Sequence, residues 1–410
     1  MGDREMVDLD LKGSVKLGNY LKQLRVGYGF SLRKVEEKAR LAGGEIDNSQ
    51  LSRYEKGRCY PSFDKLRVLA DIFNVSIQSF SDIVDLEEFE ELRPDTEAFE
   101  ELIAIGNREA VSGNYAEAYA SFQKAVDVVE EHAAGAHPDD DDDLSGQMAR
   151  ARYGLARALL RLGKLTLAEA ELRNVLRLGE EVDRGILIKT LLQLTNAHAE
   201  LGDRFLARLE AEKCLGIARE EGDTHSTAYS LHALGRIGYE DGDFKGALAY
   251  YRDALSLYEQ VEDGYNILLM KVQIGSTHVA LTHYKVGTKL IHESLRLARQ
   301  AGLRRICALA LCELVQAEFA QKSFEKAKGF IREVEVLAGS EVEEDRYLDL
   351  LFTSAYYMWE IAQAESNPIQ EKIAFGRLKY LRSSLERTTP EVDQFDAFIS
   401  QRKSRENLVS

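Results

Sequence analysis

A short polar stretch near the amino end holds the side chains best suited to chemistry. It contains Asn48, Ser49, Gln50, Ser52, Arg53, Lys56 and Arg58, and Ser31 and Arg33 lie one segment earlier. Amides and hydroxyls can hydrogen-bond to base edges, and guanidinium and ammonium groups can pair with phosphates. These nine residues are therefore candidates for contact with double-stranded DNA.

Each of these residues also has a plainer interpretation. Arg33, together with Lys34 and Lys38, has the composition of an ordinary solvated helix face. Glu55, in the middle of the polar stretch, is interpreted as structural, closing a salt bridge or capping a backbone amide inside the domain. The stretch is singled out because the apolar residues around it determine which side faces outward.

Five helices are expected to position this stretch. The first runs over residues 16–26, with Leu17, Leu21 and Leu24 on one face, and the second starts at a Ser31 cap. Residues 42–47 form a turn, and Asp47 or Asn48 caps a third helix over residues 49–56. Its Leu51 and Tyr54 face the core. A fourth helix follows Pro61, and a short fifth begins at Ser76.

Charge is distributed unevenly along the chain. The formal net charge is −16, yet residues 14–80 hold twelve Lys and Arg against seven Asp and Glu, which leaves −21 for the rest. Phosphate neutralisation depends on the surface that meets the duplex, so the local excess of +5 is the relevant value. The acidic remainder is expected to stay away from DNA.

Two runs in this region carry a family resemblance. The first is Leu51-Ser52-Arg53-Tyr54-Glu55-Lys56-Gly57-Arg58-Cys59-Tyr60-Pro61-Ser62, and the second is Leu69-Ala70-Asp71-Ile72-Phe73-Asn74-Val75-Ser76. They resemble the Xre/Cro repressor family over about 65 residues. The resemblance implies a helix-turn-helix domain over residues 14–84 in which Asn48, Ser49 and Arg53 contact base edges. Glu36, where many members have a small Ala, and a longer turn depart from the family pattern.

Bulk properties limit the remaining choices. No apolar stretch approaches the roughly 18 residues that a membrane span needs, and the acidic start does not resemble a signal peptide, so we expect a cytoplasmic protein. The four cysteines form no CxxC pair and no zinc spacing, and the eight histidines are scattered. We expect reduced cysteines, no metal site and no cofactor. Residues 85–98 are expected to form an acidic helical linker.

A recurrent unit fills residues 99–387. Its clearest copy has Gly235, Gly242, Phe244, Ala247, Tyr251 and Ala254 at positions 8, 15, 17, 20, 24 and 27, and other copies keep most of this spacing. Small residues at 8 and 20 are expected where two helices of a hairpin cross, with large residues at 17 and 24 filling the gap between hairpins. Seven such units resemble the tetratricopeptide repeat.

The resemblance implies an all-α fold: a five-helix Cro-type domain followed by a right-handed tetratricopeptide superhelix. Spacings near 40 residues indicate longer helices than the usual repeat of 34. The run Asp139 to Asp143 is interpreted as a disordered loop rather than a cation site, because adjacent carboxylates give no calcium-loop geometry. Residues 388–410 are expected to form a C-terminal tail.

Position 9 of the units is polar throughout and lines the expected inner surface. It is Asn107, Arg157, Asn196, Arg236, Ser276, Gln316 and Gln363 in the seven units. Such groups can hydrogen-bond the backbone of an extended peptide. The predicted ligand-binding residues are Arg157, Arg161, Lys189, Asn196, Tyr229, Arg236, Tyr239, Ser276 and Gln316. A polar inner face that is merely wetted by solvent is the alternative.

The order of the two regions resembles the peptide-sensing PlcR-like and Rgg-like regulators, in which an Xre-type domain precedes a tetratricopeptide array. That resemblance implies a homodimeric transcriptional regulator whose operator binding is modulated by a short signalling peptide. The alternative is a scaffold in which the array binds a protein partner and the DNA-binding domain localises the complex. No nucleophile with a base, carboxylate pair or phosphate-binding loop stands out, so an enzyme is not expected.

Overall fold

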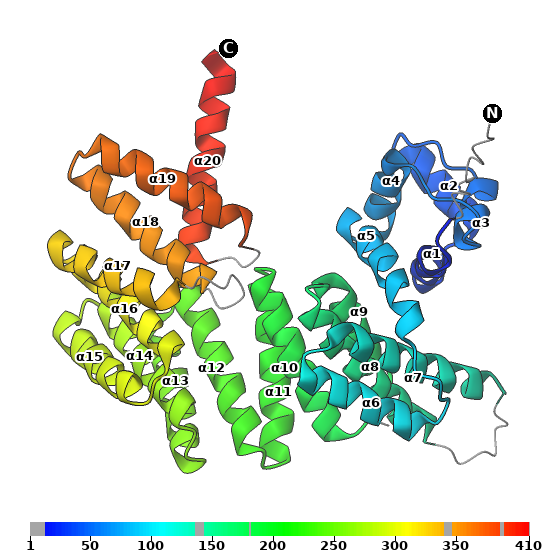
Figure 1. Ribbon diagram of the computed structural model, residues 1–410, viewed down its shortest axis with the longest axis horizontal. Helices are drawn as coiled ribbons and strands as arrows, with labels where there is room; N and C mark the ends of the chain where they lie inside the picture. The colour runs from blue at the N-terminus through cyan, green and yellow to red at the C-terminus, as the bar shows by residue number, and fades with distance from the viewer. Residues whose placement is uncertain (1–12, 136–142, 180–181, 340–346, 386–388, 410) are drawn as a thin grey trace, which may run out of the picture. The chain divides into compact units, whose positions relative to one another are not determined.

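The computed structural model describes residues 13–135, 143–179, 182–339, 347–385 and 389–409, and the regular elements in these segments are all helical (Figure 1). The chain divides into two compact structural units, which we call unit 1 (Met1–Ile186) and unit 2 (Leu187–Ser410) and which are distinct from the seven sequence repeats. The all-α fold class expected from composition and periodicity is confirmed. Residues 139–142 of the acidic run lie outside the described segments, whereas Asp143 accepts a hydrogen bond from the Gly146 amide and caps a helix.

Five helices form the N-terminal domain, as expected. They are α1 (Val15–Gly27), α2 (Leu32–Leu41), α3 (Asn48–Glu55), α4 (Phe63–Phe73) and α5 (Ile77–Asp85). The side chains of Ser14, Ser31 and Ser76 accept hydrogen bonds from backbone amides three residues later, which satisfies donors that a helix start leaves free. Their shared core includes Leu21, Val35, Leu51, Leu69 and Phe73, each at most 1% exposed.

The segment between α5 and the array, for which a helical linker is expected over residues 85–98, is helical over residues 86–92. It forms a 3-10 helix, η1 (Leu86–Leu92), and Arg93 is extended with φ −62° and ψ 129°. Pro94 explains the end of the helix, because a residue before proline is driven out of the α region. Leu86 is buried in a cluster with residues of α6, α7 and α8, and Glu87 accepts a hydrogen bond from the Lys16 amide. The connection is therefore packed against both neighbours.

Seven helical hairpins follow in the described residues. Unit 1 holds α6 (Phe99–Ser112) with α7 (Tyr115–Gly135), and α8 (Leu144–Arg161) with α9 (Leu165–Arg177). The next three are α10 (Arg184–Glu200) with α11 (Arg204–Glu220), α12 (Thr224–Glu240) with α13 (Phe244–Gln260), and α14 (Gly264–Ala280) with α15 (Tyr284–Gln300). The last two are α16 (Arg304–Ala320) with α17 (Phe324–Ala338), and α18 (Leu348–Ala364) with α19 (Pro368–Ser383). The expected tail forms a further helix, α20 (Pro390–Val409).

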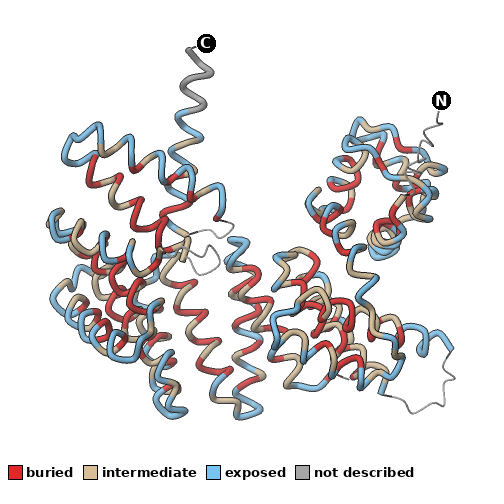
Figure 2. The backbone as a smooth tube through the Cα atoms, viewed as in Figure 1, coloured by how far each residue is buried: buried red, intermediate tan, exposed pale blue. Residues whose placement is uncertain are grey.

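Repeat positions 8 and 24 pack against each other inside a hairpin, which refines the role given to the small residues. A Cβ on Gly235 would lie 2.6 Å from Cε1 of Tyr251, and one on Gly106 would lie 2.7 Å from Cε1 of Phe122. The glycine at position 8 therefore makes room for the ring at position 24. Close approach of two backbones occurs at Gly287, where a Cβ would lie 2.5 Å from the Gly275 carbonyl oxygen. Figure 2 shows buried residues on the facing sides of the hairpin helices.

Candidate nucleic-acid interface and polar column

Helix α3 is held in place by a cap, two buried side chains and an ion pair. Asp47 is the N-cap and accepts a hydrogen bond of 2.7 Å from the Gln50 amide, while Leu51 and Tyr54 are buried. Glu55 accepts two hydrogen bonds from Arg25 of α1, at 2.6 Å from Nε and 2.9 Å from Nη2. These bonds raise the pKa of Arg25. The structural role expected for Glu55 agrees with this contact, which ties α3 to α1.

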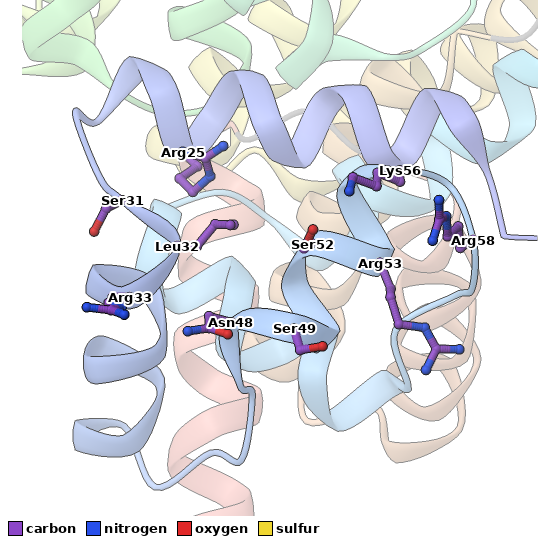
Figure 3. A pocket seen from close by; sticks show the side chains of 10 residues that line it. All are labelled: Arg25, Ser31, Leu32, Arg33, Asn48, Ser49, Ser52, Arg53, Lys56 and Arg58. Carbon is purple, nitrogen blue, oxygen red and sulfur yellow. The ribbon is translucent and has the colours of Figure 1, made fainter.

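Eight of the nine predicted DNA-contacting residues line one hollow of about 850 Å³ on the surface of the N-terminal domain. They are Ser31, Arg33, Asn48, Ser49, Ser52, Arg53, Lys56 and Arg58, and Arg25 and Leu32 complete the lining. Figure 3 shows these side chains reaching from α1, the start of α2, α3 and the turn that follows α3. Two separate segments, residues 25–33 and 48–58, thus form one polar surface.

All charged side chains that line the hollow are positive. No acidic residue lines it, and among the described residues no carboxylate forms an ion pair with Arg33, Arg53, Lys56 or Arg58. All four side chains are exposed. Unpaired, exposed cations arranged around hydrogen-bonding Ser and Asn side chains can neutralise phosphates and at the same time reach base edges.

Gln50 is the predicted residue that the hollow does not include. Its Oε1 accepts a hydrogen bond of 2.9 Å from Nζ of Lys65, so the side chain is engaged with α4. Arg25 lines the hollow although the sequence analysis did not select it. Its membership depends on α1 crossing α3, which no local pattern in the sequence reveals.

In unit 2, the polar column at position 9 is hydrogen-bonded between neighbouring hairpins. Tyr229 donates a hydrogen bond of 2.7 Å to Oδ1 of Asn196, and the hydroxyls of Tyr239 and Ser276 lie 3.2 Å apart. The amide of Gln316 donates to Glu391 of α20 at 3.4 Å. Asn196, Ser276 and Gln316 of the column are therefore each hydrogen-bonded to a side chain of another helix, rather than solvated separately.

The cations predicted for the column differ in their surroundings. In unit 1, Arg157 donates a hydrogen bond of 3.4 Å to Oδ1 of Asn107, and Arg161 is exposed. In unit 2, Lys189 is exposed and Arg236 is half-buried. Burial, and then the nearby Arg236 guanidinium, lower the pKa of His232 to about 3. His232 is therefore neutral, and Arg236 supplies the positive charge there at physiological pH.

Two acidic residues next to the column were missed by the sequence analysis. Glu313 of α16 accepts a hydrogen bond from the Ser276 hydroxyl, and burial raises its pKa to about 7. Glu391 is 8% exposed, and burial raises its pKa as well. Glu313 lies one helical turn before Gln316, so its proximity to the column could have been inferred from spacing. Glu391 could not, because it arrives on α20.

Features of other kinds of site are few among the described residues. These residues contain no group of three or more His, Cys, Asp or Glu side chains that could hold a metal ion. His278 and His283 do meet, with their Nδ1 atoms 3.5 Å apart, but as a pair. The four cysteines are free thiols. None of the described helices is long and apolar enough to cross a membrane.

Comparisons with known proteins agree with these two regions. Residues 18–85 match the helix-turn-helix domain family, and residues 227–262 match the tetratricopeptide repeat family. No curated protein matches the chain. The chain therefore carries a helix-turn-helix domain and tetratricopeptide repeats, as the sequence resemblance implied.

Solved structures also match. A Rap protein in complex with competence and sporulation factor is 13% identical over 71% of this chain and 78% of its own, with a TM-score of 0.52. Aspartyl phosphate phosphatase F from Bacillus subtilis is 14% identical over 96% of this chain and 97% of its own, with a TM-score of 0.51. PlcR from Bacillus thuringiensis, in complex with the peptide PapR7 and DNA, is 18% identical over 71% of this chain and 99% of its own. Its TM-score is 0.29, so the first two matches alone support the likeness, and they support it for the fold only.

Proposed function

We propose that this protein is a sequence-specific DNA-binding transcriptional regulator that acts in the cytoplasm as a homodimer. Helix α3 enters the major groove, where Asn48, Ser49 and Arg53 contact base edges. Arg33, Lys56 and Arg58 contact phosphates on either side. The observation that carries the proposal is the hollow lined by α1, the start of α2, α3 and the turn after α3, which gathers eight of the nine residues predicted from the sequence to contact DNA and contains no acidic side chain.

The repeat array is the proposed sensor. A short peptide with an extended backbone binds along the column of unit 2, where it exchanges hydrogen bonds with Asn196, Arg236 and Ser276. The column supports this proposal because its members already make hydrogen bonds of the kind that a peptide backbone would replace. Binding shifts the balance between conformations of the dimer, and so changes the affinity of the two heads for a pseudo-palindromic operator.

The DNA part is tested with the full chain and a site selected from a random duplex library. The double variant Asn48→Ala, Arg53→Gln should lose footprint protection of the selected site while its far-UV circular dichroism stays unchanged. Arg67→Gln is the matched control, because Arg67 is an exposed cation on α4 that does not line the hollow. If the double variant binds the site as tightly as Arg67→Gln does, α3 is not the reading helix.

The sensor part is tested separately. Native mass spectrometry of freshly purified protein, before and after extraction of small peptides, identifies a bound ligand by its mass. Asn196→Ala combined with Arg236→Ala should remove the thermal stabilisation by that ligand and leave DNA binding of the ligand-free protein unchanged. Lys213→Ala, which removes an exposed charge from α11 outside the column, should retain the stabilisation. Capture of a folded protein instead of a peptide would favour the scaffold function.

A further inference from the structure

Helix α20 covers the last two hairpins of the array. Its Val392 and Phe395 are buried in the cluster formed by α14 to α19, and the Phe395 and Phe398 rings lie 6.1 Å and 5.0 Å from the ring of Trp359 on α18. Gln394 accepts a hydrogen bond of 2.7 Å from the Tyr356 hydroxyl. Figure 1 shows the first part of α20 beside α18 and α19.

The first turn of α20 also brings a buried carboxyl group to the polar column. Glu391 is 8% exposed and accepts a hydrogen bond of 3.4 Å from Gln316 of α16. Its negative charge, after burial, contributes to the raised pKa of Glu313. Gln316 lies one helical turn from Glu313 on α16, so its bond to Glu391 brings the two carboxyl groups to the same side of that helix. We term Glu313 and Glu391 the carboxyl pair.

Among the described residues, no Lys, Arg or His forms an ion pair with either member of the carboxyl pair. The titratable and polar groups around it are Arg236 and Tyr239 of α12, Ser276 of α14, Cys312 of α16, Tyr356 and Tyr357 of α18, and Thr389 just before α20. Glu360 of α18 is joined to this group through Tyr356. Burial raises the pKa of each of these tyrosines, of Cys312 and of Glu360, so the tyrosines and Cys312 are uncharged near neutral pH. The cation that α19 presents to α20, Arg382, is paired with Asp396 at 3.0 Å.

Two ionised carboxylates in this environment would repel each other in a medium of low polarity, with no partner cation among the described residues. A single proton removes most of that repulsion, because like charges that share a buried site disfavour joint ionisation. We propose that α20 is a detachable cover of the array, docked while the carboxyl pair holds one proton and released when that proton is lost. This proposal does not depend on the proposed function in DNA binding.

The chain contains its own probe for this event. Trp359 is its single tryptophan, and two aromatic rings of α20 pack against it. Release of α20 would expose the indole to water and shift its emission to longer wavelength. Titration of the full chain from about pH 5.5 to about pH 8.5 should show this shift with a midpoint near pH 7, because the pKa of Glu313 is about 7.

Matched variants separate the carboxyl pair from other titrating groups. Glu391→Gln and Glu313→Gln should each abolish the shift, since one neutral partner removes the repulsion. Asp393→Asn, which removes an exposed carboxylate from the same helix, should keep the wild-type midpoint. Glu360→Gln removes the carboxyl group next to Trp359 in sequence, whose pKa is also raised by burial, and should likewise keep the wild-type midpoint. A wild-type emission that does not change over this range overturns the proposal, and so does an unchanged transition in both Gln variants of the carboxyl pair.

Discussion

Gly235 offers a direct test of how the hairpins pack. A Cβ added at this position would lie 2.6 Å from Cε1 and 2.7 Å from Cδ1 of Tyr251, which is closer than real Cβ contacts allow. The Tyr251 side chain is 1% exposed, so its ring cannot move aside into solvent. Forcing an extra methyl group into a packed core costs about 1–3 kcal/mol, whereas the helical preference of Ala over Gly returns only about 1 kcal/mol. Gly235→Ala should therefore destabilise the protein.

Gly216 of α11 provides the opposite case. Apart from its chain neighbours and the backbone of its own helix, no atom lies within 4 Å of the Cβ that would be added there, and the residue is exposed inside a helix. Gly216→Ala should stabilise the protein by about 0.5–1 kcal/mol, because Ala loses less conformational freedom on folding. Urea unfolding followed by circular dichroism measures both variants, and midpoints are compared because repeat arrays depart from two-state behaviour. Midpoints that move in the same direction in the two variants would refute the packing argument.

Three further predictions concern single side chains. Lys56→Gln should reduce the slope of log K against log salt for DNA binding by about 1, as expected when the phosphate contact of one cation is lost. Tyr258→Phe should raise the melting temperature, because the buried hydroxyl of Tyr258 has no hydrogen-bond partner among the described residues. An unsatisfied buried polar group of this kind costs about 1–3 kcal/mol. Tyr229→Phe, which breaks a bond to Asn196, should not raise the melting temperature. The raised pKa of Glu313 means that the folded state holds its proton more tightly than the unfolded state, so stability should fall as pH rises from about 4.5 to about 7. The loss is about 3 kcal/mol, and Glu313→Gln should flatten this part of the stability profile measured by urea unfolding.

Local patterns were sufficient to predict most of the secondary structure. Capping serines and apolar residues at 3.6-residue spacing located the five helices of the N-terminal domain, and the recurring Gly, Ala and aromatic positions located the hairpins. These signals are local because a helix cap and an amphipathic face involve residues within a few turns of each other. The linker was predicted less well. Pro94 indicated where the helix had to end. The 3-10 geometry of η1 could not be predicted from local sequence, because η1 is packed through Leu86 against the first hairpins.

The candidate sites depended more on tertiary structure. Polarity and spacing along one helix predicted that Asn48, Ser49 and Arg53 face outward together. The exclusion of Gln50 and the inclusion of Arg25 required knowledge of α4 and α1, because Lys65 and Glu55 are their partners.

By itself, the sequence determined that the chain is helical, that a cationic head precedes an acidic repeat array, and which side chains lie on each helix face. These properties follow from composition and from contacts between residues a few positions apart. Only the tertiary structure decided which of those side chains share a site, and the carboxyl pair shows this most clearly. Glu313 and Glu391 are 78 residues apart in the sequence and become electrostatic neighbours only because α20 folds back on α16. Burial, and with it the energy of a charge, is a property of the assembled core rather than of any segment.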